Sequence, residues 1–332
     1  MAAYDKQHFS PTMANSWWAD DQRHYVCFYR DNRSGSVAID PAKGRRAWGQ
    51  VRRAWSKATE QALDRELETP VAPIYRRMLE GQWPRGRARA KWAQFLLSQF
   101  VRTPTFIRYE TFAKQLHGLT AVPDHDRVGC EHCDDLNYVT SREWVLLVAH
   151  SDHFFIRTDN PVLLTGPLER TESVIYYPMT PRVCFVALPR PSGDAVLPES
   201  LENMRAFRLS RSDAHFINFH CCKHADQSLI AHPKYDAEIG RSMFTDIMGA
   251  YPQAPFLLHL PHQAPAADVY ASVQDLQSTC DRPLPPWNAS DLENIARQFV
   301  CRQDSQEPTE LHFSKEVQPY PVPPDRSTAS AR

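Results

Sequence analysis

Hydrophobic and polar positions change their period several times along the chain, and each change predicts a different element. Between residues 8 and 39 aromatic residues alternate with polar ones, which is typical of short strands, and segments 25–30 and 37–39 predict a hairpin around a glycine-containing loop. From Trp48 to Ala62 the apolar residues recur at three and four positions, which predicts an amphipathic helix. Two more helices are predicted, one following Pro70 and one over about residues 87–101.

The second half of the chain has the short apolar runs of strands. Residues 144–149 and 153–156 predict a second hairpin. Further strands are expected over residues 162–164, 174–177, 183–188 and 228–231, with a helix from 211 to about 226. Prolines interrupt this region repeatedly, so the strands should be short or lie at sheet edges.

These elements together predict an α+β protein with N-terminal strands, a central helical layer and a proline-interrupted, mostly antiparallel sheet. We expect an α+β domain over residues 1–238 and a helical extension over residues 239–302. Residues 303–332 combine many prolines with few apolar side chains, which predicts a disordered tail because little burial offsets the entropy of ordering.

Composition narrows the class of protein. The formal net charge of -1 provides no broad field that would attract nucleic acid or an anionic membrane. No segment approaches the roughly 20 apolar residues of a membrane span, and the N-terminus lacks the apolar core of a secretion signal, so we expect a soluble, cytoplasmic protein without membrane contact. No glycine-rich phosphate-binding loop is present, and we expect no cofactor.

The most informative segment is Phe154 to Val162, where an apolar run ends in Thr158, Asp159 and Asn160 before a proline. Asp and Asn favour turns by bonding to their own backbone, and proline biases the preceding residue towards extended geometry. The sequence therefore predicts a carboxylate held firmly at the end of a strand.

Three segments, in this order, resemble the signatures of the DUF4238 family. They are Lys6 to Pro11, which contains His-x-x-Pro, then Arg102-Thr103-Pro104, and then Phe155 to Val162, where the family has Thr-Ser-Asp-Asn-Pro-Val after an aromatic strand. Tyr177 to Pro181 resembles the proline-rich strand that follows, so the resemblance extends over roughly residues 6–235. Arg157 and Thr158 depart from the family pattern.

The family has no established activity, so the resemblance implies an order of elements and a shortlist of polar residues. The shortlist carried over to this chain is His8, Pro11, Arg102, Asp159 and Asn160. If these groups converge, His8 can act as acid and base, Arg102 can stabilise anionic charge, and Asp159 with Asn160 can orient water, substrate or metal. That arrangement predicts a hydrolase of phosphoester type, of which a nuclease-like enzyme is one form.

In the alternative interpretation, the same side chains stabilise the fold and take no part in catalysis. Arg102 and Asp159 would then form an ion pair between the helical layer and the sheet, with His8 capping a strand. The protein would be a binding or interaction protein that engages a partner through a surface groove or through its C-terminal extension. We favour this second interpretation, and whether the protein is an enzyme stays open at this point.

Two cysteine-containing constellations have weaker support. Cys130 and Cys133 have the spacing of half a zinc site, which the segment His220 to His224 would have to complete, but no second pair with standard spacing follows, and a polar loop is favoured. Cys221 and Cys222 stand beside histidines, yet catalytic pairs are usually distant in sequence.

Basic residues gather between residues 43 and 91, interleaved with tryptophans. On one face they would form a surface for a nucleic-acid backbone with stacking groups. The competing interpretation places the tryptophans in the core and the arginines on solvated helix backs. We favour the latter, because acidic residues share these helices: Glu60, Asp64, Glu66, Glu68 and Glu80.

Overall fold

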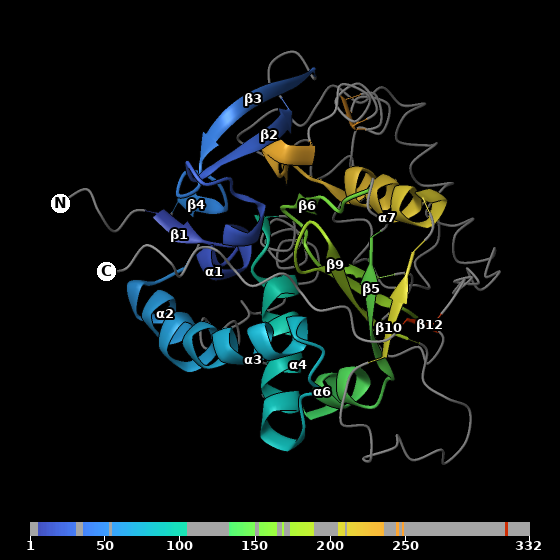
Figure 1. Cartoon of the computed structure of the whole chain (residues 1–332). Helices are drawn as coiled ribbons and strands as arrows, with labels where there is room; N and C mark the ends of the chain where they lie inside the picture. Colours follow the sequence, from blue (N-terminus) through green and yellow to red (C-terminus); the bar gives the residue numbers. More distant parts are fainter. Residues whose placement is uncertain are drawn as a thin grey trace, which may run out of the picture.

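A computed structural model of the protein describes the following residues: 6–30, 36–52, 55–104, 133–149, 153–164, 168, 173–188, 205–209, 211–235, 244–245, 248 and 316–317. Both helices and strands are present, and the protein has the predicted α+β architecture (Figure 1).

The N-terminal half contains the first strands and most of the helices. Its elements are β1 (Lys6–His8), α1 (Thr12–Asn15), η1 (Ser16–Trp18), β2 (His24–Arg30), β3 (Val37–Gly44), β4 (Gln50–Arg52), α2 (Lys57–Ala62), η2 (Leu63–Glu68), α3 (Thr69–Leu79) and α4 (Gly86–Val101). Strands β2 and β3 pair antiparallel, which confirms the first hairpin. The helix predicted over about residues 87–101 is confirmed as α4.

The helix predicted from Trp48 to Ala62 is wrong over its first half. Residues 50–52 form β4 because β1 offers them an antiparallel partner, and the helix begins only at Lys57. Its start is capped by Ser56, whose hydroxyl accepts a hydrogen bond from the backbone N–H of Thr59 at 3.1 Å. From there α2, the π-helical η2 and α3 follow one another directly, and Pro70 lies at the start of α3.

The C-terminal half contributes most strands. Its elements are α6 (Cys133–Thr140), β5 (Trp144–Val148), β6 (Arg157–Thr158), β7 (Leu163–Leu164), β8 (Ile175–Pro178), β9 (Val183–Ala187), β10 (Arg205–Arg208), α7 (Arg211–His224), β11 (Ser228–Ala231), η4 (Pro233–Tyr235) and β12 (Glu316–Val317). The second predicted hairpin is wrong. Strand β5 pairs with β9 and β10, whereas residues 153–156 form no strand and β6 pairs with β11.

The strands form three sheets. A six-stranded sheet has the order β12-β10-β5-β9-β8-β7, a four-stranded sheet has the order β3-β2-β11-β6, and β1 pairs with β4. The six-stranded sheet is antiparallel except between β10 and β5.

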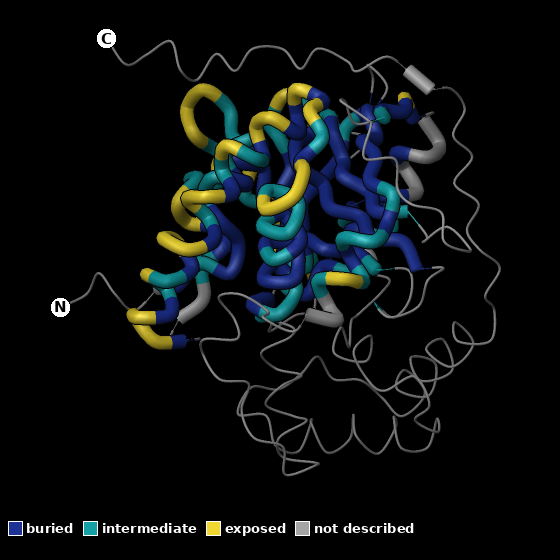
Figure 2. The backbone as a smooth tube through the Cα atoms, turned by 90° about the horizontal axis from the view of Figure 1, so that it is seen from below, coloured by how far each residue is buried: buried dark blue, intermediate teal, exposed yellow. Residues whose placement is uncertain are grey.

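The six-stranded sheet is buried on both faces, so its central strands read as continuous apolar runs. Alternate residues of β5, such as Trp144 and Leu146, pack with residues of α3 and α4 on one face. The residues between them, such as Val145 and Leu147, face α7 and strand β2 on the other. Figure 2 shows this core as a continuous dark-blue interior, with exposed residues on the outer turns of the helices.

Among the described residues, no helix combines the length and the apolar character needed to cross a membrane. Most of the predicted extension over residues 239–302 lies outside the described residues. Two residues of that extension, Phe244 and Met248, are buried against the domain, and the Phe244 ring contacts Phe28 and Phe154. In the predicted tail, residues 316–317 form β12.

Candidate functional site

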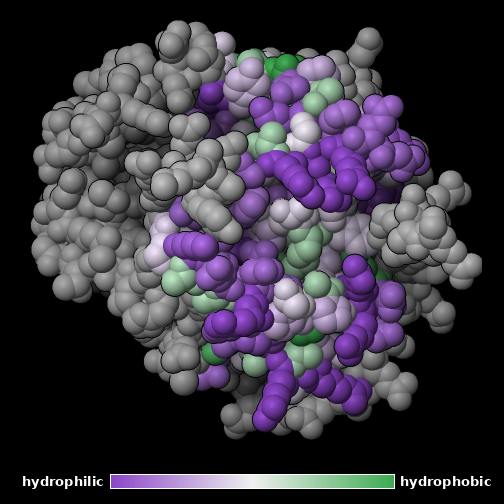
Figure 3. Space-filling view, turned by 90° about the vertical axis from the view of Figure 1, so that its left-hand side faces the viewer, coloured by the Kyte–Doolittle hydropathy of each residue, from purple (hydrophilic) through white to green (hydrophobic). Residues whose placement is uncertain are grey.

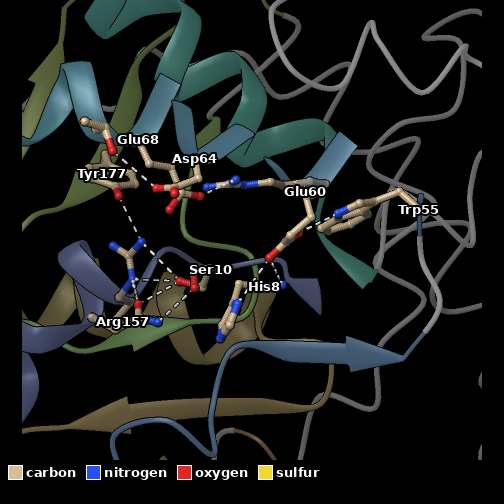
Figure 4. Close-up of polar contacts among 11 residues, drawn as sticks. His8, Ser10, Trp55, Glu60, Asp64, Glu68, Arg157 and Tyr177 are labelled. Carbon is tan, nitrogen blue, oxygen red and sulfur yellow. Dashed lines mark hydrogen bonds and ion pairs between the residues drawn. The ribbon is translucent and has the colours of Figure 1, made fainter. Parts of the chain in front are cut away.

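Three carboxylates line one side of the helical segment from α2 to α3. Glu60, Asp64 and Glu68 follow one another at intervals of four residues and share a pocket with a volume of about 460 Å³. The other residues that line it are His8, Thr12, Met13, Gln61, Thr69 and Ala72. Figure 4 shows the three acids in a row above His8, and Figure 3 shows that the described surface on this side of the molecule is largely hydrophilic.

His8 lies at the end of β1, between Glu60 of α2 and strand β4. Glu60 Oε1 accepts hydrogen bonds from the His8 backbone N–H and pairs with His8 Nδ1, each at 3.2 Å. A carboxylate can only accept, so Nδ1 carries the proton, and Nε2 faces the side-chain amide nitrogen of Gln50 at 3.1 Å. His8 is thereby oriented from both sides.

The backbone at Gly49 brings β4 close enough to β1 for Gln50 to contact His8. Gly49 has a positive φ of 79°, and a side-chain carbon there would lie 3.2 Å from the Ser10 carbonyl oxygen. The Ser10 N–H donates to the Gly49 carbonyl at 3.3 Å, and in β1 His8 pairs directly with Gln50. Glycine is therefore required where β4 begins.

Glu60 is the most elaborately bonded acid of the pocket. Besides the two contacts with His8, its Oε2 accepts a hydrogen bond from the Trp55 indole N–H at 2.7 Å. Burial opposes the ionisation of Glu60, but the hydrogen bonds from His8 and Trp55 outweigh this effect and lower its pKa. Glu60 is thus held as a carboxylate.

Arg102 reaches the pocket only through Glu68. Its guanidinium is fully buried at the end of α4, and Nη1 donates to Glu68 Oε1 at 2.7 Å. With the Gln99 amide oxygen turned towards Arg102, Nε donates to it at 2.9 Å. The predicted ion pair between Arg102 and Asp159 is not formed, because α4 packs against η2 and brings Glu68 to Arg102 instead.

Asp159 and Asn160 lie at a different junction, where α7 ends and β11 begins. The Asp159 carboxylate accepts three backbone hydrogen bonds, from Asp226 at 2.8 Å, Gln227 at 2.6 Å and Ser228 at 2.7 Å. Asn160 donates from its side chain to the His224 carbonyl at 2.9 Å. We call this arrangement of Asp159 with residues 226–228 the Asp159 knot.

The knot is dry. Asp159 is buried, and its burial, together with the nearby Asp226, raises its pKa to about 7, although the three backbone N–H groups act in the opposite direction. Neither Asp159 nor Asn160 is among the residues that line the pocket. The structure therefore brings His8 to the pocket, links Arg102 to it through Glu68, and places Asp159 and Asn160 elsewhere.

Pro11 and Arg157 complete the surroundings of the site. The Pro11 carbonyl accepts hydrogen bonds from the backbone N–H groups of Ala14 and Asn15, and thereby starts α1 beside the pocket. Arg157 is fully buried and donates to the Asn15 side chain at 2.9 Å, the Pro178 carbonyl at 3.0 Å and the Tyr177 hydroxyl at 2.9 Å. It ties the N-terminal segment to β6 and β8 (Figure 4).

Four residues in or near the pocket are not among the candidates that the sequence predicts. Glu60, Asp64 and Glu68 were interpreted as a solvated helix face, yet their spacing of four already places them together on one side of a helix. Arg157 was noted only as a departure from the family pattern. An arginine inside an otherwise apolar strand is a signal for buried polar partners, because a buried guanidinium needs them.

The remaining constellations are less suited to a site. Trp48, Trp55 and Trp92 are buried and Trp83 is partly buried, so these rings offer little stacking surface to nucleic acid. Cys221 and Cys222 are buried, and burial raises the pKa of both thiols, which opposes a nucleophilic thiolate.

A zinc site finds no support in the part of the chain that the structure describes. No group of three or more potential ligands there could hold a metal ion. Cys130 and the Cys133 side chain lie outside the described residues.

Fold and site together define an α+β protein with an acidic pocket between its N-terminal segment and its helical layer. The family model of DUF4238, described as a protein of unknown function, matches residues 134–235. The resemblance to this family is confirmed over that segment, which contains Arg157, Asp159 and Asn160. No curated protein and no solved structure matches the chain.

Proposed function

We propose that the protein is a binding protein whose pocket receives a positively charged group of a ligand or partner. Three carboxylates line the pocket, and the only arginine that contacts them among the described residues, Arg102, is buried and engaged by Glu68. Carboxylates only accept hydrogen bonds, and they bond most strongly to charged N–H donors such as ammonium and guanidinium groups.

Asp64 is the observation that carries this proposal. It is exposed and accepts a hydrogen bond from the Thr69 hydroxyl at 3.3 Å, and in the described part of the chain it pairs with no basic side chain. Glu60 and Glu68, on either side of it, are already bonded to His8 and Arg102. A ligand cation would complete the row, in a pocket whose volume is typical of small-ligand sites, which span roughly 300–1,000 Å³.

Calorimetric titration with agmatine, which carries one guanidinium and one ammonium group, tests the proposal. The wild-type protein should bind agmatine, and Asp64→Asn should weaken binding at least tenfold because one acceptor carboxylate is lost. Glu66→Gln is the matched control, since Glu66 is an exposed acid of the same helical segment that does not line the pocket. Absence of agmatine binding, or equal weakening in both variants, would contradict the proposal.

A phosphoester hydrolase is the second candidate, supported by the His8 and Glu60 pair. A carboxylate that orients an imidazole is the usual arrangement of a general base. Against it, the pocket is acidic, Arg102 is committed to Glu68, and Asp159 and Asn160 are bonded within the knot. Hydrolysis of bis(p-nitrophenyl) phosphate by the wild-type protein, lost in His8→Gln, would favour this candidate over the binding protein.

We also propose that the protein is cytoplasmic and that its partner is another protein, which the C-terminal extension helps to bind. A pocket that recognises cationic side chains suits a protein partner rather than the phosphate backbone of a nucleic acid. Nucleic-acid binding on the basic segment 43–91 is accordingly the less favoured alternative.

A further inference from the structure

Strand β10 occupies a special position in the six-stranded sheet. It pairs parallel with β5 on one side, over all four residues from Arg205 to Arg208. On its other side it pairs antiparallel with β12, in the register Ala206 with Val317 and Phe207 with Glu316. A strand near the C-terminus of the chain thus covers the edge of a sheet formed by the domain (Figure 1).

Strand β12 has two residues and is shorter than β10, which has four. The two register pairs involve only the central residues of β10, and strand pairs of two residues are well below the usual length. An uncovered edge strand presents unpaired N–H and C=O groups and is a template for another extended chain. The pairing with β12 is therefore short enough to be displaced by a longer strand.

The sequence around β12 has the pattern of a strand ligand. Between Pro308 and Pro319 no proline interrupts the chain, and the apolar residues Leu311, Phe313 and Val317 are separated by even numbers of positions, with Lys315 between the last two. Alternation with a period of two is typical of a strand with one face against a protein. The flanking prolines lack the N–H needed to extend a ladder, so they limit the strand to this window.

We propose that the edge of β10 is an acceptor site for an extended peptide, and that the chain's own C-terminal segment around residues 316–317 is the latch that occupies it. Recognition by strand addition draws its affinity from backbone hydrogen bonds and its specificity from alternate side chains. A partner would carry an extended segment with alternate apolar residues and would replace the latch. This inference concerns a surface distinct from the pocket and does not depend on it.

Hydrogen–deuterium exchange of the full chain tests the latch. The double variant Glu316→Pro and Val317→Pro removes two backbone N–H groups and should break the pairing. Exchange over residues 205–208 should then be at least tenfold faster than in the wild type. The control variant, Ser327→Pro and Thr328→Pro, adds two prolines to the same tail away from β12 and should leave this exchange unchanged.

A fluorescent peptide that spans residues 309–320 tests the acceptor site. It should bind the variant with prolines at 316 and 317 at least tenfold more tightly than the wild type, because the resident strand no longer competes. Unchanged exchange over residues 205–208 would overturn the latch. Faster exchange without any binding of the peptide would overturn the acceptor site.

Discussion

The pocket and the Asp159 knot each contain a carboxylate with several hydrogen-bond partners, but the two regions treat that carboxylate in opposite ways. Glu60 is partly exposed, and the hydrogen bonds from His8 and Trp55 lower its pKa. Asp159 is buried, and burial raises its pKa despite three backbone donors. The knot uses its acid to hold the chain together, whereas the pocket leaves acids accessible to a ligand.

The segment that the family model matches includes the Asp159 knot but not the acids of the pocket. Residues 134–235 contain the knot, while His8, Glu60, Asp64 and Glu68 lie before this segment. The segment that the family model matches thus contains the Asp159 knot, whereas the acids that line the pocket lie before this segment. The predictions below, from the largest expected effect on stability to the smallest, test this separation.

The largest loss of stability is expected for Asp159→Ala. The backbone N–H group of Asp226, which is buried, and those of Gln227 and Ser228, which are half-buried, would lose their acceptor, and a fully buried unsatisfied group costs about 1–3 kcal/mol. Allowing for partial relaxation, the free energy of unfolding should fall by about 3–5 kcal/mol in urea denaturation. A loss below about 1 kcal/mol would show that the knot does not hold the α7–β11 connection.

The next effect in size is expected for Glu68→Gln. The Arg102 guanidinium is fully buried, and without the carboxylate its charge is uncompensated, which should cost about 2–3 kcal/mol. The double variant Glu68→Leu and Arg102→Met removes both charges and should recover most of that loss. If the double variant is no more stable than Glu68→Gln, the ion pair does not account for the effect.

A smaller, pH-dependent effect is expected at Glu60. Because its pKa is lower in the folded state than in the unfolded state, its contribution to stability is present above the unfolded value near pH 4.5 and is lost as the pH falls through the folded value. Glu60→Gln should therefore flatten the acid side of the stability profile, measured by urea denaturation between about pH 2 and 6. A profile as steep as that of the wild type would contradict the hydrogen-bond assignment.

The smallest effect on stability is expected for Asp64→Asn. Asp64 is exposed and accepts only the Thr69 hydroxyl, so the free energy of unfolding should change by less than about 0.5 kcal/mol. The same variant should have the largest effect on agmatine binding. If Asp64→Asn is as stable as the wild type but does not bind agmatine, then Asp64 serves binding whereas Asp159 serves stability. Strong destabilisation by Asp64→Asn would contradict this distinction.

Much of the fold could be predicted from local pattern. The α4 and α7 helices, the β2–β3 hairpin and the strand of residues 228–231 follow from periodicity and turn residues. The predictions failed where a partner from elsewhere decided the outcome. Residues 50–52 are a strand because β1 is available, and β5 joins β9 and β10 rather than its neighbour in sequence.

The candidate site shows the same division. The turn at Thr158 to Pro161 and the firm hold on Asp159 were predictable, because Asp, Asn and proline determine local geometry. The partners were not. Asp159 bonds to residues 226–228 and Arg102 to Glu68, over separations of about 70 and 34 residues.

The sequence by itself determined the class of fold, the polar turn after the strand, and the family resemblance, because these depend on neighbouring residues and on the order of motifs. Only the tertiary structure decided that Arg102 is neutralised by Glu68, that His8 meets Glu60 and Gln50, and that Asp159 is withdrawn from the pocket. Ion pairs and hydrogen bonds act over a few ångströms, so which charges meet depends on how distant elements pack.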